Sequence, residues 1–561
     1  MDQATLQSRI DAALGKIPCD LVLKNLHYLD VFTGTWKIGD LGILGETIAV
    51  LDVGTSGKRA IDASSYWAVP GFIDAHVHIE SSLLTPGHFQ EVVLPKGTTT
   101  AICDPHELAN VQGISGIQFF LDEAQKLKLD LRVMLSSCVP ATHMETNGGG
   151  TLRKDHLLPL MNHPKALGLA EMMNFPGVLH QDPDVLEKIV AFSERRIDGH
   201  CPLLSGKELS AYAASGISSC HESSELEEAQ EKLQKGLAVW IREGSVAKDL
   251  KALISILDWA SSPFIGFCTD DRNPLDILKE GHLNFLVREA IQSGIPAEVV
   301  YRSASWSVAR HYGLDQGAHR VGALAPGYKA DLVLLEDIQS CSIKEVIKSG
   351  ELISEISFSS QNAFSSLPSI RAKTPSSEEL TGPAGRIHCI EVFPGKILTG
   401  RSVRHSQDCG VARLSVLERY GNGFPPANGY VFGFGKNLQG AIASSVGHDS
   451  HNLCVVGTEV SDMQVALNCL IQSGGGFAVV KDRAVIAQLA LPFGGLMSFE
   501  TPQIVAKKLE ELRKASASIG CELPEPFLQL AFLALPVIPT LKLTDRGLVD
   551  VNLFKIIDVR A

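Results

Sequence analysis

The sequence predicts a (β/α)8 barrel inserted in a small β-sandwich domain, with an additional C-terminal α/β domain. A chain of 561 residues exceeds the ~250–300 residues at which a single core stops growing, so several domains are expected. Eight short apolar runs, each followed by an amphipathic stretch of helical period, lie between residues 71 and 270. This alternation is typical of a parallel α/β architecture. A polar stretch rich in Ser and Pro then separates the last part of the chain.

The first elements are strands. Residues 19–69 are β-rich and broken by Gly and Asp turn residues, so residues 1–69 are expected to form the N-terminal part of the small β domain. The eight apolar runs that follow are 71–79, 98–104, 131–137, 166–171, 196–201, 216–221, 236–243 and 264–270. Eight strands with eight crossovers fit a barrel over residues 70–318, and a doubly wound parallel sheet is the competing layout.

The remaining chain divides into three parts. Residues 328–337 again form a strand pattern, so residues 319–365 are expected to return to the small β domain. The segment 366–385 is composed like a linker. Residues 386–561 contain strands and helices of their own, which is enough for an independent C-terminal α/β domain.

Composition excludes several classes of partner. The 50 Lys and Arg against 63 Asp and Glu give a net charge of −13, the wrong sign for binding nucleic acid or an anionic bilayer. The longest apolar stretch, 528–538, is too short for the ~20 residues of a membrane span. The N-terminal segment lacks the pattern of a signal peptide. The 12 cysteines include no C-x-x-C pair, which disfavours a disulfide framework or zinc ribbon. We expect a cytoplasmic protein.

Metal-competent side chains close several of the apolar runs. Two histidines separated by one residue on a strand face the same side, although one such pair is close to chance among 18 histidines. Each candidate alone is more often a core histidine or a capping acid. In a barrel, however, the strand ends meet at one rim, so six candidates together predict a metal site. They are His76, His78, Glu171, His200, His221 and Asp270.

Longer motifs resemble a known family. The segment PGFIDAHVHIESSLLTP (70–86) resembles the first metal-binding strand of the amidohydrolase superfamily, and together with CDPHELANVQG (103–113) it is similar to the adenine deaminase family. The segments 241–245, 267–274, 324–335, 433–452 and 535–551 also resemble that family. One departure is Ser305-Trp306-Ser307, where the family usually has Asn-Pro-Ala, and it leaves the exact substrate specificity open.

The resemblance implies a binuclear divalent metal centre, with Mn²⁺ or Fe²⁺ typical and Zn²⁺ possible. It implies that His76, His78 and Asp270 hold one ion and that His200 and His221 hold the other. Glu171 would bridge the two ions. Many relatives bridge with a carbamylated lysine, but the fourth run ends in Glu171, and Lys165 lies at its opposite end. Imidazole and carboxylate ligands suit Mn, Fe or Zn.

The implied reaction is hydrolytic deamination of adenine to hypoxanthine and ammonia, in purine salvage. Metal lowers the pKa of bound water toward ~7, and Asp270 would take the proton. Glu107 is a further catalytic candidate, and His106, Asp271 and His451 are candidates for binding substrate. His106 and Glu107 either shuttle protons or make ordinary loop hydrogen bonds. Asp271 either accepts from a ring N–H or caps the following helix.

Other readings remain open on the sequence. The loop containing His448, Asp449 and His451 either closes over the purine or secures the interface with the barrel, and we favour the active-site role. Glu222 and Arg242, together with Glu80, are candidates that the sequence does not rank. The rival functions are deamination of another 6-substituted purine, another amidohydrolase reaction, and an inactive barrel with a binding or assembly role. All six ligand positions are filled, which counts against the last. We also expect a homo-oligomer.

Overall fold

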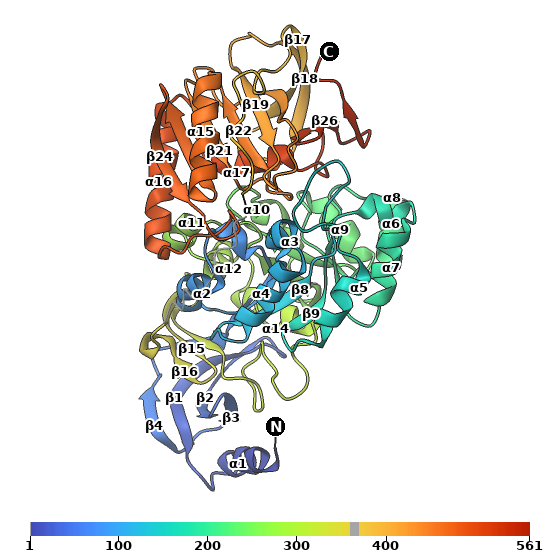
Figure 1. Ribbon diagram of the computed structural model, residues 1–561. Helices are drawn as coiled ribbons and strands as arrows, with labels where there is room; N and C mark the ends of the chain where they lie inside the picture. The colour runs from blue at the N-terminus through green and yellow to red at the C-terminus, as the bar shows by residue number, and fades with distance from the viewer. Residues whose placement is uncertain (1, 359–369) are drawn as a thin grey trace.

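The computed structural model describes residues 2–358 and 370–561 (Figure 1). In Figure 1 an N-terminal sheet lies at the bottom, an α/β region in the middle and a C-terminal unit at the top. Within these described ranges no helix is both long and apolar enough to cross a membrane. The 12 cysteines are free, and all except Cys409 and Cys469 are buried.

The N-terminal sheet is built from two distant parts of the chain. Its strands before the α/β region, which follow helix α1 (Gln3–Ala13), are β1 (Cys19–Asp30), β2 (Thr35–Leu44), β3 (Thr47–Leu51), β4 (Gly57–Asp62) and β5 (Trp67–Pro70). The later strands are β14 (Leu332–Asp337), β15 (Ser342–Lys348) and β16 (Glu351–Leu352). Strand β14 pairs antiparallel with β5, so the chain returns to the first sheet. Hydrogen bonds join all eight strands into one sheet, where a two-sheet sandwich was expected.

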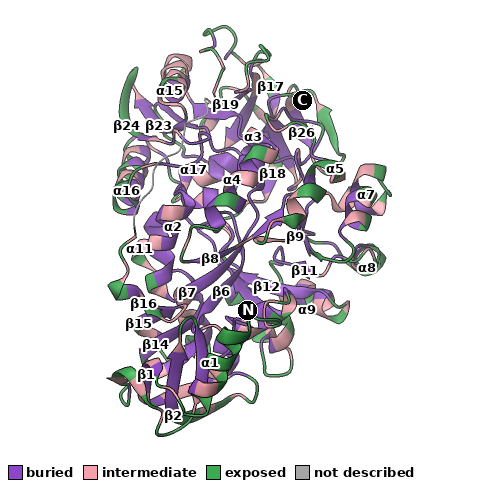
Figure 2. Ribbon diagram, turned by 60° about the horizontal axis from the view of Figure 1, so that its bottom comes forward, coloured by how far each residue is buried: buried purple, intermediate pink, exposed green. Residues whose placement is uncertain are grey.

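The α/β region contains a strand in each of the eight predicted runs. The strands are β6 (Phe72–Val77), β7 (Thr98–Cys103), β8 (Asp130–Leu135), β9 (Ala166–Met172), β10 (Arg196–Gly199), β11 (Ser219–Cys220), β12 (Ala238–Arg242) and β13 (Ile265–Cys268). All pairs between consecutive strands are parallel, and the strands are almost entirely buried (Figure 2). Burial on both faces explains why the runs are continuously apolar instead of alternating.

These strands form two sheets and not one continuous ladder. Strands β6 to β10 make a five-stranded sheet, and β11 to β13 make a three-stranded sheet. A few contacts connect the two sheets at each seam: Ser218 N–H donates to the carbonyl of Ile197 at 2.9 Å, and Val77 bridges to Asp270. The structure is therefore a mixed α/β fold whose eight-stranded closure is not complete.

Helices follow or separate the strands of this region. They are α2 (Pro86–Val93), α3 (His106–Gln112), α4 (Ile114–Ala124), α5 (Lys154–Leu157), α6 (Phe175–Leu179), α7 (Pro183–Ala191), α8 (Gly206–Ala214), α9 (Leu226–Gln234), α10 (Leu250–Leu253), α11 (Pro274–Lys279), α12 (Leu283–Gln292), α13 (Ala297–Ser303) and α14 (Trp306–His311). Helix α12 shows why these segments fold this way, since Leu283, Leu286, Val287 and Ala290 recur at helical spacing and are all buried.

The predicted linker lies partly outside the described residues, because 366–369 are not described. From residue 370 to 385 the chain has no helix or strand, but it is not detached from the fold. Leu380 is fully buried among apolar side chains of the C-terminal unit, including Met463 and Leu467. Through Leu380, this part of the predicted linker packs against the core of the C-terminal unit.

The C-terminal unit is an eight-stranded sheet with two long helices. The elements are β17 (Arg386–Val392), β18 (Thr399–His405), β19 (Val411–Leu417), β20 (Ala427–Phe432), β21 (Ala441–Ser444), β22 (Leu453–Gly457), α15 (Val460–Ser473), β23 (Gly476–Lys481), β24 (Ala484–Ala490), α16 (Pro502–Ser518) and α17 (Pro526–Ala531). A small sheet of β25 (Leu541–Thr544), β26 (Gly547–Asp550) and β27 (Lys555–Ile557) ends the chain.

The C-terminal unit packs directly on the α/β region. Ser498 N–H donates to the carbonyl of Leu83 at 2.8 Å, and Lys279 pairs with Glu510 at 3.0 Å. One buried apolar cluster includes residues of both units, among them Leu108 and Phe493. This shared core places the loop before β22 and the segment after α17 against the ends of the parallel strands.

Candidate metal centre and active site

The site begins with two histidines at the end of β6. His76 is the next-to-last residue of the strand, His78 directly follows it, and both are buried. Alternate strand residues face the same side, and the two Nε2 atoms lie 3.0 Å apart. Asp270, just beyond β13, places Oδ1 at 3.6 Å from His76 Nε2 and 3.3 Å from His78 Nε2. These three side chains form a donor group suited to a divalent metal.

The backbone of Asp270 is fixed by β6. Its N–H donates to the carbonyl of His76 at 3.1 Å, and its carbonyl accepts from the N–H of His78 at 3.2 Å. Asp270 has a φ of 53°, a left-handed conformation that Asp adopts more readily than most residues with a side chain. The contact between the first and the last parallel strand therefore holds the three donors together.

Glu171 lies between two groups of histidines. It is the next-to-last residue of β9, and its Oε1 is 3.6 Å from His76 Nε2 and 3.2 Å from His78 Nε2. Its Oε2 is 2.6 Å from His200 Nδ1 and 3.4 Å from His221 Nε2. Each oxygen of this one carboxylate therefore faces a different pair of imidazoles.

Two further charged residues, Glu222 and Arg242, contact the histidines and Asp270 from β12 and from the loop after β11. Glu222 Oε1 lies 3.8 Å from His200 Nδ1 and 3.6 Å from His221 Nε2. Arg242, the last residue of β12, pairs with Glu222 and also donates from Nη1 to Asp270 Oδ2 at 3.1 Å. The guanidinium thus fixes two carboxylates, and it leaves Asp270 Oδ1 directed toward the histidines.

The charges of the site favour ionised carboxylates. Burial raises the pKa of Glu171, but the imidazoles of His200 and His221 outweigh burial and hold that pKa well below its usual range. Burial also opposes ionisation of Asp270, whose pKa is nevertheless held well below its usual range by a neighbouring imidazole and the guanidinium. Burial lowers the pKa of His76 to about 4. Burial opposes protonation of His221, but the carboxylate of Glu171 raises its pKa to about 9, so metal binding at this imidazole requires the loss of a proton.

Glu107 is the centre of a second polar group. It lies in the first turn of α3, and its Oε1 is 2.6 Å from His448 Nδ1 and 3.4 Å from His106 Nε2. Its Oε2 contacts Nε2 of His451. Burial raises the pKa of Glu107, but the neighbouring imidazoles, that of His448 above all, hold it well below the usual range. Two histidines of the C-terminal unit therefore hold an ionised carboxylate of the α/β region.

His106 connects the two groups. Its Nδ1 lies 3.0 Å from Asp104 Oδ2 and 3.4 Å from Glu171 Oε1, and its Nε2 lies 3.8 Å from Asp449 Oδ1. Burial opposes protonation of His106, but the carboxylate of Asp104 raises the pKa of the imidazole well above its ordinary value. A protonated His106 is thus placed between the metal donors and Glu107.

Asp271 faces the cavity and does not cap the next helix. The residue that caps α11 is Asn273, whose side chain accepts from the N–H of Asp276 at 3.0 Å. The capping alternative for Asp271 is therefore wrong. Asp271 instead accepts a hydrogen bond from the hydroxyl of Ser81 and lines the same cavity as the metal donors.

The loop before β22 contributes to the site and also anchors the C-terminal unit. His448 and Asp449 line the cavity, whereas His451 lies behind Glu107 and is not among the lining residues. The next polar residues face the α/β region: Ser450 donates to Glu145 at 2.6 Å, and Asn452 donates to the carbonyl of Thr146 at 2.9 Å. The two roles considered for this loop are therefore divided among its residues.

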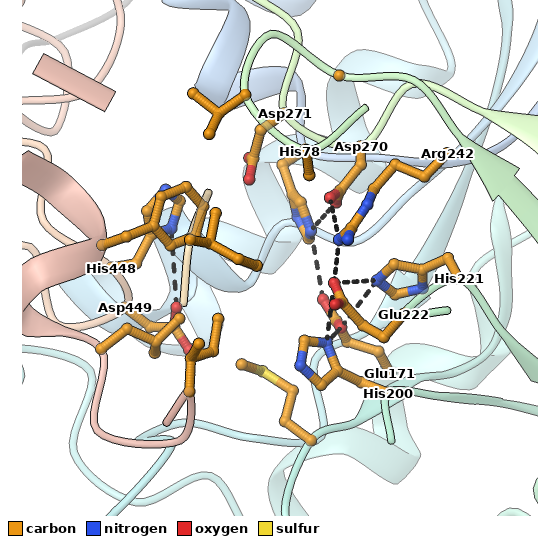
Figure 3. A pocket seen from close by; sticks show the side chains of 18 of the residues that line it. His78, Glu171, His200, His221, Glu222, Arg242, Asp270, Asp271, His448 and Asp449 are labelled. Atoms are coloured by element: carbon orange, nitrogen blue, oxygen red, sulfur yellow. Dashed lines mark hydrogen bonds and ion pairs between the residues drawn. The ribbon is translucent and has the colours of Figure 1, made fainter. Parts of the chain in front are cut away.

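A cavity of about 30 Å³ lies between these groups. In Figure 3 the candidate metal donors His78, Glu171, His200, His221 and Asp270 point toward one another, and His448 and Asp449 lie on the opposite side. Apolar side chains complete its wall, and they are Met173, Val246, Ile397, Phe532, Leu535 and Ile538. The site thus combines metal donors, a polar edge and an apolar wall.

Sequence reasoning left several lining residues unassigned. Arg242 lies in the segment 241–245 that resembles the family, whereas Glu222 lies in none of the segments that do. The contacts of both side chains with the candidate metal donors were not visible from spacing. Met173 lies only two residues beyond Glu171, and nothing in the sequence signalled that it would line the cavity. Phe532 comes from an apolar stretch that reads as ordinary core.

A parallel α/β core with four histidines and two carboxylates at the strand ends defines a metal-dependent hydrolase of the amidohydrolase type. The family described as "Amidohydrolase family" matches residues 67–353, and "Adenine deaminase C-terminal domain" matches residues 396–555. The chain belongs to the adenine deaminase family within the amidohydrolase superfamily.

Similar proteins support this assignment over the full length. "Adenine deaminase 1" of Agrobacterium fabrum is 47% identical over 568 residues, covering 99% of this chain and 98% of its own. "Adenine deaminase" of Brucella suis is also 47% identical, covering 99% and 97%. A solved N-acetyl-D-glucosamine-6-phosphate deacetylase from Mycobacterium smegmatis covers 59% of this chain and 99% of its own at 15% identity and a TM-score of 0.43. The assignment rests on the sequence relatives and family matches alone.

Proposed function

We propose that this protein catalyses the hydrolytic deamination of adenine to hypoxanthine and ammonia, as a step of purine salvage. The observation that carries the proposal is the cavity itself. Metal donors of the amidohydrolase region and polar residues of the adenine deaminase C-terminal domain line one cavity, and both regions match full-length adenine deaminases.

The donor set fits two divalent cations. His76, His78 and Asp270 would hold one ion, His200 and His221 would hold the other, and Glu171 would bridge them. The fit rests on the buried imidazole nitrogens at 3.0 Å, which need a cation or proton between them, and on the two oxygens of Glu171 facing separate histidine pairs. Mixed nitrogen and oxygen donors suit Mn²⁺, Fe²⁺ or Zn²⁺. The family resemblance favours Mn²⁺ or Fe²⁺, with Zn²⁺ as an alternative.

Asp270 is proposed as the general base. When bound, the metal ions supply a water molecule whose pKa falls toward ~7. Asp270 Oδ1 faces the histidine donors, so it is placed to accept a proton from the attacking water and to pass it to the departing amino group. Arg242 holds Oδ2 and so keeps the other oxygen aimed at the reaction.

Glu107 and its histidines are proposed to supply the proton that the purine ring needs. Burial opposes protonation of His448, but the charge of Glu107 raises the pKa of His448 to about 9. The imidazolium of His448 therefore stores a proton at pH 7, and Glu107 relays it toward a ring nitrogen. The second proton of the attacking water, released when the new C6–O bond becomes the carbonyl of hypoxanthine and the C6–N bond to the amino group breaks, returns to this pair. His106 and Asp271 are proposed to hold the ring through hydrogen bonds, and His451 is proposed to act through Glu107.

The finer architecture is part of the proposal. We propose that the two parallel sheets act as a (β/α)8 barrel over residues 70–318, inserted in a domain formed by residues 1–69 and 319–365. Residues 386–561 would form the C-terminal domain after the 366–385 segment. The backbone contacts at both seams between the sheets support this arrangement. The cytoplasmic location and the homo-oligomer stay predictions.

The test is product analysis with a purine panel. Protein loaded with Mn²⁺ or Fe²⁺ is incubated with adenine, N6-methyladenine or guanine, and the products are separated by chromatography while ammonia is measured. We expect hypoxanthine and ammonia in equal amounts from adenine, and loss of this activity after chelation. Hypoxanthine and methylamine from N6-methyladenine, or ammonia from guanine, with no product from adenine, would contradict the proposed substrate.

A further inference from the structure

A second, larger cavity adjoins the catalytic cavity. Its volume is about 840 Å³, against about 30 Å³ for the catalytic cavity. It is lined by the loops after β8 and β9 and by the segment around residue 537. Two of its lining residues are exposed, Leu203 by 56% and Phe554 by 42%. The larger cavity therefore reaches the protein surface.

A thin partition separates the two cavities. The segment 535–539 turns Leu535 and Ile538 toward the catalytic cavity, whereas its neighbours Pro536, Val537 and Pro539 line the larger one. Met173 is the one residue that lines both cavities among those of the described chain. Its side chain is buried, and it directly follows the last residue of β9, two residues beyond Glu171.

The catalytic cavity is too small for a purine as it stands. About 30 Å³ holds one or two water molecules, and a bicyclic purine needs several times that room. The polar walls cannot give way easily, since Arg242, Glu107 and His448 are buried and tied by ion pairs. Met173 is different, because an unbranched thioether with three rotatable bonds fills gaps and changes rotamer at low cost.

We propose that purines enter and leave through the larger cavity, and that Met173 is the residue that limits the size of the purine admitted to the metal site. The inference rests on the proposed function, since the ligand is taken to be a 6-substituted purine. A side chain shared by both cavities sets the width of the passage between them. Shortening it joins the cavities and leaves room for a substituent on the exocyclic nitrogen.

The first test compares Met173→Ala with the volume-conserving Met173→Leu. The kcat/KM of N6-methyladenine and of a bulkier N6-alkyladenine is measured relative to that of adenine. We expect Met173→Ala to raise this ratio by at least about tenfold, the usual effect of one or more methylene groups in an apolar pocket. Met173→Leu should change the ratio by less than about twofold, since leucine and methionine have similar volumes. Metal content and melting temperature confirm that both variants are folded.

The second test blocks the proposed route through the larger cavity. One of its readouts, the rate of metal release, does not require catalysis. Val537→Cys places a thiol in the larger cavity, in a background where the lining Cys138 and the exposed Cys409 are changed to Ser. The protein is labelled with a bulky maleimide, and mass spectrometry verifies the label. The matched control is Val485→Cys on β24, which is 42% exposed and lies outside both cavities. Labelled Val537→Cys should lose most adenine turnover, and it should release metal to 1,10-phenanthroline more slowly than labelled Val485→Cys.

The outcomes separate this inference from the proposed function. An unchanged substrate ratio in folded, metal-loaded Met173→Ala would overturn the role of Met173. Equal rates of metal release from the two labelled proteins would overturn the route. If the wild type fails to deaminate adenine, the proposed function fails, while the metal-release comparison still decides whether the larger cavity leads to the site.

Discussion

His451 holds Glu107 without lining the cavity, so its removal tests positioning apart from contact with substrate. Its Nδ1 accepts from the N–H of Gly447 at 3.2 Å, and this places its own proton on Nε2, toward Glu107. Burial lowers the pKa of His451 to about 4, so the imidazole is neutral at pH 7. His451→Ala therefore removes one donor from a fully buried carboxylate.

The expected loss of activity in His451→Ala depends on the contacts that Glu107 retains. His448 remains at 2.6 Å, so one of two imidazole contacts from the C-terminal unit is lost. A hydrogen bond to a charged group contributes about 1.5–3 kcal/mol, and kcat/KM for adenine should fall by about ten- to a hundredfold. A donor to the charged form lowers a pKa, so its loss raises the pKa of Glu107. The acid limb of the kcat/KM profile should then move to higher pH.

The assay is the pH dependence of kcat/KM for adenine in wild type, His451→Ala and His451→Gln, with melting temperatures measured alongside. Glutamine retains an N–H donor and should recover part of the lost activity. A purely structural role would lower the melting temperature and leave both the kinetic constants and the acid limb unchanged. That result would refute the positioning role of His451.

Three further predictions concern other parts of the chain. Asp270→Asn should lower kcat by at least ~10² while the melting temperature stays close to wild type, and near-normal turnover would remove Asp270 from the reaction. Because Glu171 lies between the histidine pairs and Lys165 is paired with Asp130 at 2.8 Å, metal reconstitution should need no bicarbonate; a requirement for it would indicate a carbamylated lysine. Burial lowers the pKa of Lys542 to about 7 against ~10.4 in an unfolded chain, so the unfolded state binds more protons and stability should rise from pH 7 to pH 10. Lys542→Met should flatten that rise in denaturant titrations, unlike the exposed control Lys507→Met, and an unchanged slope would contradict the buried, neutral lysine.

Local patterns in the sequence predicted the elements of the fold well. Each of the eight apolar runs contains a strand, because burial on both faces makes such a run recognisable without any knowledge of its neighbours. The hydrogen bonds between strands were less predictable. Strand β11 pairs with β12 over only two residues, and the ladder is interrupted beside β10. The point at which hydrogen bonding between two strands stops depends on how the strands pack in the folded protein. The sequence of a single strand does not predict it.

In the site, too, the positions of residues at strand ends were predictable, whereas contacts between side chains were not. His76, His78 and Asp270 could be predicted to meet, since parallel strands bring their carboxyl ends to one edge. Two kinds of contact could not be predicted. The ion pair of Arg242 with Glu222 depends on side-chain rotamers, and the approach of His448 to Glu107 depends on how the C-terminal unit docks. Contacts of this kind follow from tertiary packing and have no signature in local spacing.

The most direct test of the account is a metal titration of metal-free protein. Mn²⁺ is added in known equivalents, and the rate of ammonia release from adenine is measured at each step. Because Glu171 faces two separate histidine groups, we predict that activity rises to a plateau at two ions per chain. Full activity in the metal-free protein, or no adenine deamination with both sites filled, would contradict the account.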